Sequence, residues 1–129
     1  MFKIQKEQMT AFRQEAMTAF EERMSAHLHK IFPAYCEAFG DDAVTRLIRY
    51  GVRRAERYGI VAERGVFVFV DAMFAFGRDF DEDPEFPWAA AILGDVEAKP
   101  LDKVDRLFDA AFEHIDKARG IRAEEAAVV

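Results

Sequence analysis

Apolar residues recur every three or four positions along most of this chain, which is the spacing of one face of an α-helix. The first such run covers residues 5–32 and contains no Gly or Pro. Its apolar positions are Met9, Phe12, Ala16, Phe20, Met24, Leu28 and Ile31. The pattern predicts a helix about 40 Å long. Pro33 ends it, and a short helical turn over residues 33–39 closes at Gly40.

Three later segments also have helical spacing. Asp41 and Asp42 precede a helix predicted over residues 43–58, with Gly59 after it. A short helix is predicted over residues 87–93, because Pro87 suits a first helical position. The last predicted helix covers residues 101–119, and residues 121–129 are predicted to be a flexible tail. The inward stripe of this last helix is Leu101, Val104, Leu107, Phe108, Ala111, Phe112 and Ile115.

The segment over residues 63–76 is ambiguous. Its run from Val66 to Val70 favours a strand by propensity. The run is long for a strand, however, has no hairpin partner and ends at Gly77, as helices do. We therefore expect a buried central helix. The predicted fold is all-α, a single-domain bundle of five or six helices over residues 1–120 with a long N-terminal helix.

The chain is rich in phenylalanine, with 13 residues. This number predicts either a Phe-rich core or an apolar surface that binds a partner. Phe67 and Phe69 lie on roughly opposite faces of the central helix. One of these faces could therefore bind a partner helix or a second copy of the chain, which makes a homodimer one expectation.

The net charge of -6 disfavours nucleic acid as a partner, because phosphate binding needs a basic surface. No apolar run approaches the ~20 residues of a membrane-spanning helix, so no membrane insertion is expected. Cys36 is the single cysteine, which fits a reducing compartment. The first residues are interrupted by charge, unlike a signal peptide. A cytoplasmic location is expected, and the absence of Asn beside abundant Ala and Arg suggests bacterial origin.

A basic stripe is the first candidate site. Arg46, Arg49, Arg53 and Arg57 follow one side of the helix predicted over residues 43–58. They could bind an acidic partner segment. Alternatively, they form a solvated face or pair with the acidic residues 79–85. The tentative protein-binding residues are these four arginines together with Phe67 and Phe69.

Asp79, Asp81 and Asp83 resemble the start of a calcium-binding loop. Such a loop needs Gly at its sixth position and Glu at its twelfth, where this chain has Pro84 and Ala90. We expect these aspartates to shape a turn and to orient the following helix, without a metal.

No catalytic arrangement is evident in the sequence. His27 and His29 are two residues apart on a helix and so point to different faces. His114 stands alone on the last helix, and a pair of Cys36 with a histidine would lack an orienting third residue. We expect a non-enzymatic protein without a cofactor. The alternative is a small helical enzyme, or a metal- or ligand-binding protein, that uses the carboxylates of Asp79–Asp83 with His27 or His114.

The segments ERYGI and FAFGRDFDEDPEFPWA suggest a family. The chain resembles, over about residues 2–118, small bacterial proteins whose genes often lie beside type VI secretion spike and effector genes. The most specific residues are Phe76, Gly77, Asp79, Phe80, Asp81, Asp83, Pro84, Pro87, Trp88 and Ala89. The resemblance implies an accessory role, as an adaptor, chaperone or immunity-type partner of a secreted toxin. It implies no catalytic or binding residues.

Overall fold

The computed structural model describes residues 6–127, and the side chains from Ala11 onward except that of Phe12. Its α-helices are α1 (Lys6–Ile31), α2 (Pro33–Phe39), α3 (Asp41–Glu56), α4 (Glu63–Phe76), α5 (Pro87–Leu93), α6 (Pro100–Glu113) and α7 (Ala123–Ala127). A 3₁₀ helix, η1 (Ile115–Lys117), follows α6. No strand occurs within this described part of the chain, so the all-α prediction is confirmed. The described residues form seven α-helices, one more than the upper end of the predicted count, because α7 was not expected.

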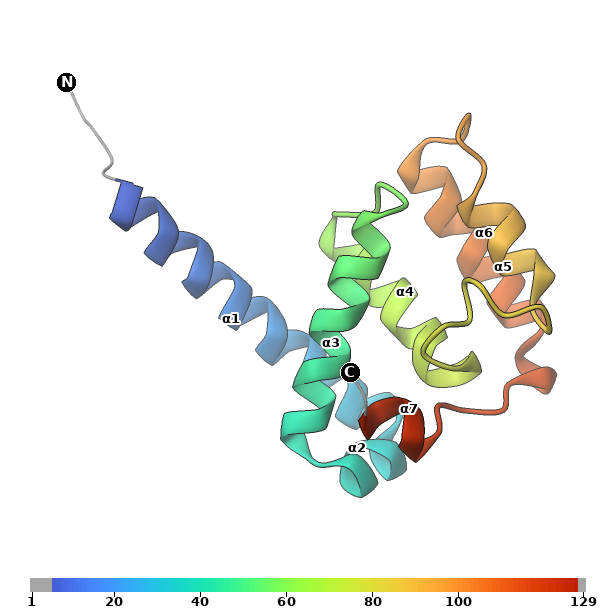
Figure 1. Ribbon diagram of the computed structural model, residues 1–129, viewed down its shortest axis with the longest axis horizontal. Coiled ribbons are helices and arrows are strands. Elements are labelled where there is room, and N and C mark those ends of the chain that lie inside the picture. Colours follow the sequence, from blue (N-terminus) through green and yellow to red (C-terminus); the bar gives the residue numbers. More distant parts are fainter. Residues whose placement is uncertain (1–5, 128–129) are drawn as a thin grey trace.

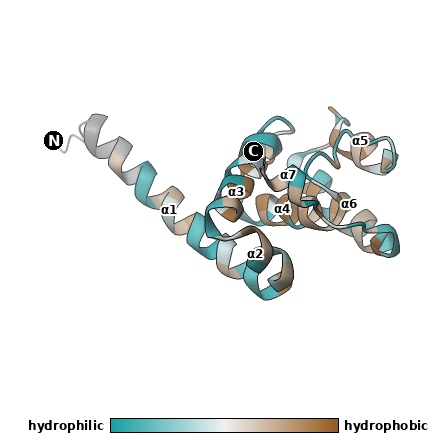
Figure 2. Ribbon diagram, turned by 60° about the horizontal axis from the view of Figure 1, so that its bottom comes forward, coloured by the Kyte–Doolittle hydropathy of each residue, from teal (hydrophilic) through white to brown (hydrophobic). Residues whose placement is uncertain are grey.

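Helix α4 is the centre of the fold, as predicted. It lies between α3 and α6 in both ribbon views (Figures 1 and 2). Phe69, Phe74 and Phe76 of this helix are fully buried. Close packing of α3 on α4 depends on Gly51, because a Cβ there would lie 2.6 Å from Val70 Cγ2. The run of Val and Phe residues has a high strand propensity, but it forms a helix because its surroundings in the fold are apolar on most sides.

Helix α1 packs on the body through its second half only. Met24 and Leu28 are buried against the core, whereas Ala11 and residues 13–18 are exposed. Figure 1 shows this first half extending away from the other helices. The predicted apolar stripe is therefore covered over about half its length, and Ile31 at its end is exposed. The predicted positions Met9 and Phe12 lie outside the described side chains.

Residues 121–127 do not form the expected flexible tail. Gly120 N donates to the carbonyl oxygen of Ala75 at 2.7 Å, and Ile121 N donates to that of Phe74 at 2.9 Å. Ile121 is 3% exposed, and α7 packs on α3. The physical reason is that the last carbonyls of α4 have no partners within the helix. The chain after α6 supplies the donors that these carbonyls need.

Candidate functional site

Each of the three loop aspartates contacts an arginine. The pairs are Asp79 with Arg78 at 3.2 Å, Asp81 with Arg54 at 2.8 Å, and Asp83 with Arg119 at 2.7 Å. The arginines come from three separate parts of the chain, so the pairs fix the loop between α4 and α5 against α3 and the segment after η1. The predicted turn-forming role fits these contacts.

Arg54 and Asp81 form the buried part of this network. Arg54 is 8% exposed and Asp81 is 2% exposed. Arg54 Nε and Tyr58 OH both donate to Asp81 Oδ2, at 2.8 and 2.5 Å. Arg54 Nη1 also donates to Tyr50 OH at 2.7 Å, and Tyr50 OH donates in turn to Asp79. Asp81 Oδ1 has no hydrogen-bond partner, and Arg54 Nη2 lies 2.8 Å from a Glu82 carboxylate oxygen without hydrogen-bond alignment.

The network shifts the pKa values of its members. Burial, with a hydrogen bond to Asp79, raises the pKa of Tyr50 to about 12. Burial, with a hydrogen bond to Asp81, raises the pKa of Tyr58 to about 12. Burial raises the pKa of Asp79, but the hydrogen bond from Tyr50 and the charge of Arg78 outweigh this effect and lower it. The network is thus a charged, hydrogen-bonded support for the loop.

The histidines lie elsewhere and are not joined to the loop. His27 Nε2 lies 2.8 Å from Asp71 Oδ1. His114 stacks on Trp88 with ring centroids 5.3 Å apart. Among the described residues, no group of three or more His, Cys, Asp or Glu side chains could hold a metal ion. Among the described contacts, His27 and His114 therefore contact Asp71 and Trp88 and not the loop aspartates.

The single cysteine is also unlike a nucleophile. Cys36 is buried, and burial together with the nearby charge of Asp41 raises the pKa of its thiol. A thiol with a raised pKa is mostly protonated at neutral pH and reacts slowly.

The six tentative protein-binding residues have different environments. Arg46 and Arg53 on α3 and Arg57 just after it are exposed, and the exposed Arg49 pairs with Glu21 of α1 at 2.8 Å. None of these four arginines pairs with the acidic loop among the described contacts, and Arg54 takes that role instead.

The two phenylalanines of this set are not on a free surface. Phe69 is fully buried, so assigning it to a binding surface was wrong. Phe67 is half-buried against Phe20 and His27, at centroid distances of 5.8 and 5.0 Å. Helix α4 therefore leaves little apolar surface around Phe67 and Phe69 for a second copy of the chain.

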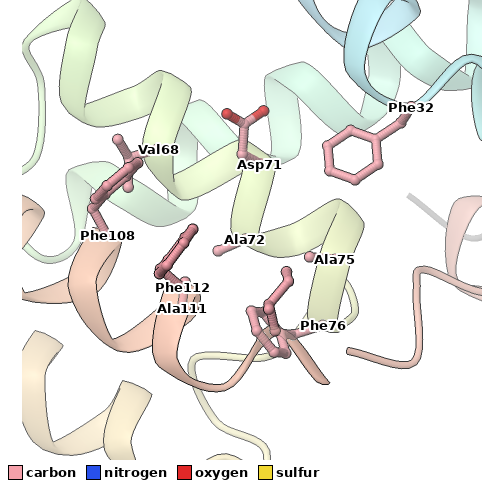
Figure 3. Close-up of a pocket in the computed structure, with 10 residues that line it drawn as sticks. Phe32, Val68, Asp71, Ala72, Ala75, Phe76, Phe108, Ala111 and Phe112 are labelled. Carbon is pink, nitrogen blue, oxygen red and sulfur yellow. The ribbon is translucent and has the colours of Figure 1, made fainter. Parts of the chain in front are cut away.

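An apolar groove of about 190 Å³ lies between α4 and α6 (Figure 3). Its walls include Val68, Ala72 and Ala75 of α4, Phe108 and Phe112 of α6, and Ile115 of η1. Phe108 is 55% exposed, Phe112 73% and Ile115 55%. We call this surface the α4/α6 groove.

The groove was missed because the whole apolar stripe of the last helix was assigned to the core. Val104 and Leu107 are buried as expected, but Phe108 and Phe112 face solvent. The helix also ends at Glu113, short of the predicted Arg119. The signal in the sequence was the width of the stripe, since adjacent positions such as Leu107 and Phe108 differ by 100° around a helix. Only part of so wide a stripe can contact one neighbouring helix.

Asp71 is the charged residue among those that line the groove. Figure 3 shows its carboxylate on α4, between Val68 and Phe32. Burial raises the pKa of Asp71, and the hydrogen bond from His27 opposes this shift. The groove therefore combines a large apolar surface with one partly desolvated carboxylate.

Comparisons with protein-family models, with curated proteins and with solved structures found no match to this chain. The chain also has no helix in its described part that is both long enough and apolar enough to cross a membrane.

Proposed function

We propose that this protein is a non-enzymatic interaction module that binds a helix of a protein partner in the α4/α6 groove. The observation that supports this proposal is the exposure of Phe108, Phe112 and Ile115 around one concave surface. Grouped exposed apolar side chains in a folded domain commonly mark a binding surface. A groove between two helices suits an amphipathic helix, which buries its apolar face there.

The biological role that we propose is that of a cytoplasmic adaptor, chaperone or immunity-type accessory to a type VI secretion effector. The resemblance over residues 76–89 supports this role. In the structure those residues mainly build the loop network and anchor α5, through contacts such as Arg54 with Asp81 and Phe76 with Trp88. We propose that these residues support the fold, and that the partner is bound at the α4/α6 groove, which Phe76 also lines.

The test compares partners captured by purified variants. Tagged wild-type protein and a Phe108→Ser/Phe112→Ser variant are used to capture partners from extracts of the native cell, with mass identification. The double variant should lose the partner while keeping a wild-type melting curve, because both side chains are mostly exposed. Val96→Ser is the matched control, since Val96 is 89% exposed in the loop before α6. An unchanged set of partners in the double variant would refute the groove as the binding surface.

Two further variants separate the competing surfaces. Charge reversal at Arg46 and Arg53 removes exposed cations of α3 without touching the groove. Loss of the partner in this variant alone would place the interface on α3. Light scattering of the wild type and the groove variant tests self-association. A dimer that becomes a monomer only in the groove variant would identify the partner as a second copy of the chain.

A further inference from the structure

Acidic residues border the α4/α6 groove on its α6 side. Each exposed apolar residue there is followed by an acid, in the pairs Phe108–Asp109, Phe112–Glu113 and Ile115–Asp116. One residue corresponds to 100° around a helix, so in α6 Asp109 and Glu113 lie on the solvent side of the apolar stripe. Asp109 and Glu113 line one shallow depression together with Phe108 and Phe112.

These border acids are available to a partner. Asp105, one turn earlier, pairs with Arg64 at 3.0 Å. Asp109, Glu113 and Asp116 have no ion pair with any of the described residues. The neighbouring cation in the sequence is Lys117, so the border retains a negative charge.

The opposite wall of the groove also presents a carboxylate. Both oxygens of Asp71 lie near the single atom His27 Nε2, at 2.8 and 2.9 Å. A carboxylate has about four acceptor positions, so this contact leaves some of them unused. Asp71 is held within an apolar lining, where an added cation interacts more strongly than it would in bulk water.

We propose that the α4/α6 groove binds a basic amphipathic α-helix, with apolar residues against Phe108, Phe112 and Ile115 and Lys or Arg residues beside Asp71, Asp109 and Glu113. This proposal rests on the proposed function and specifies the chemistry of the partner. Phe108 and Phe112 are one turn apart on α6, about 6 Å, and Ile115 continues this row in η1. A ligand helix would match this row with apolar anchors at positions i, i+3 or i+4, and i+7.

The test uses three synthetic peptides of about 18 residues, long enough to form a helix on their own. All three have the same Leu stripe, and the flanking positions are Lys in the first peptide, Gln in the second and Glu in the third. Fluorescence anisotropy with the whole protein gives each affinity. An exposed ion pair changes affinity by roughly 1.4- to 5-fold. Three such pairs predict that the Lys peptide binds about ten-fold tighter than the Gln peptide, and tighter still than the Glu peptide.

Variants connect this preference to the groove. Asp109→Lys/Glu113→Lys should abolish or invert the preference for Lys, while Glu97→Lys, in the loop before α6, is the matched control for total charge. Phe112→Ser should weaken all three peptides, since it removes the shared apolar contact. Raising the salt concentration should reduce the preference for Lys without removing the binding.

The outcomes distinguish the two proposals. Equal affinities for the three peptides, all lost in Phe112→Ser, would refute the basic helix and leave the proposed function supported. Binding of the Lys peptide that survives Phe112→Ser would place its site outside the groove and refute this inference. No binding by any peptide, with the cellular partners unchanged in the groove variant, would refute both proposals.

Discussion

Replacing Arg54 by Met tests whether the buried ion pair fixes the loop. Arg54 and Asp81 are both almost fully buried, so removing the guanidinium leaves a carboxylate without its counter-ion. Breaking a buried pair in this way typically costs about 3–5 kcal/mol. Methionine retains an apolar stem of similar length, so most of this effect should come from the charge.

The loss of stability in Arg54→Met has an upper bound that depends on pH. A stranded carboxylate can avoid its buried charge by binding a proton. Protonating an ordinary aspartate, of pKa about 3.9, costs about 4 kcal/mol at pH 7 and about 1.5 kcal/mol at pH 5. In the variant the folded state would hold this proton while the unfolded state would not, so the loss of stability should shrink as the pH falls.

The assay is urea unfolding of the wild type and variants at pH 7 and pH 5. Arg53→Met is the matched control, because Arg53 is the exposed neighbour on the same helix, and it should change stability by less than about 0.5 kcal/mol. Arg54→Met/Asp81→Asn removes both charges and should recover about 2 kcal/mol at pH 7 relative to Arg54→Met. A loss of stability that is the same at both pH values would refute the reasoning and assign the effect to packing.

Two further predictions concern stability and titration. Ile121→Ala should lower the free energy of unfolding by about 2–4 kcal/mol in a urea titration, because Ile121 is buried in the core. A change below about 0.5 kcal/mol would mean that this segment is not packed on the core. Tyr50 and Tyr58 should ionise at about pH 12 in the folded protein, as measured by ultraviolet absorbance. The free energy of unfolding should fall as the pH rises from about 10, because the tyrosines of the unfolded chain release their protons first. Ionisation of all tyrosines at pH 10 before any unfolding would contradict the network.

Much of the helical architecture could be predicted from periodicity and breakers. The boundaries of α2, α4 and α5 follow from Pro33, Pro87 and the glycines Gly40, Gly77 and Gly94. Periodicity gives the apolar face of a helix but does not show whether another element covers that face. Periodicity therefore predicts a core position for Phe108 and Phe112, although α4 covers only one side of their helix.

The loop network was only half predictable. The aspartates were identified as structural, but their main partner was sought among Arg46, Arg49, Arg53 and Arg57 rather than Arg54. A signal was present, because Tyr50 and Arg54 are four residues apart and share one face of α3, and Tyr58 continues this interval just after the helix ends. Which of two adjacent arginines points inward depends on where the loop of residues 77–86 returns to α3.

The hydrogen bonds from Gly120 and Ile121 to the end of α4 have a consequence for how the protein is made. The ribosome completes α4 well before it adds these residues, so the innermost helix emerges with its final turn unprotected. During that interval the phenylalanines of α4 are more exposed than in the folded protein. A nascent chain would then depend on a holdase or on rapid elongation to avoid aggregation. The end of α4 can be fully enclosed only after Gly120 and Ile121 have been synthesised, so burial of this central helix is completed late in folding.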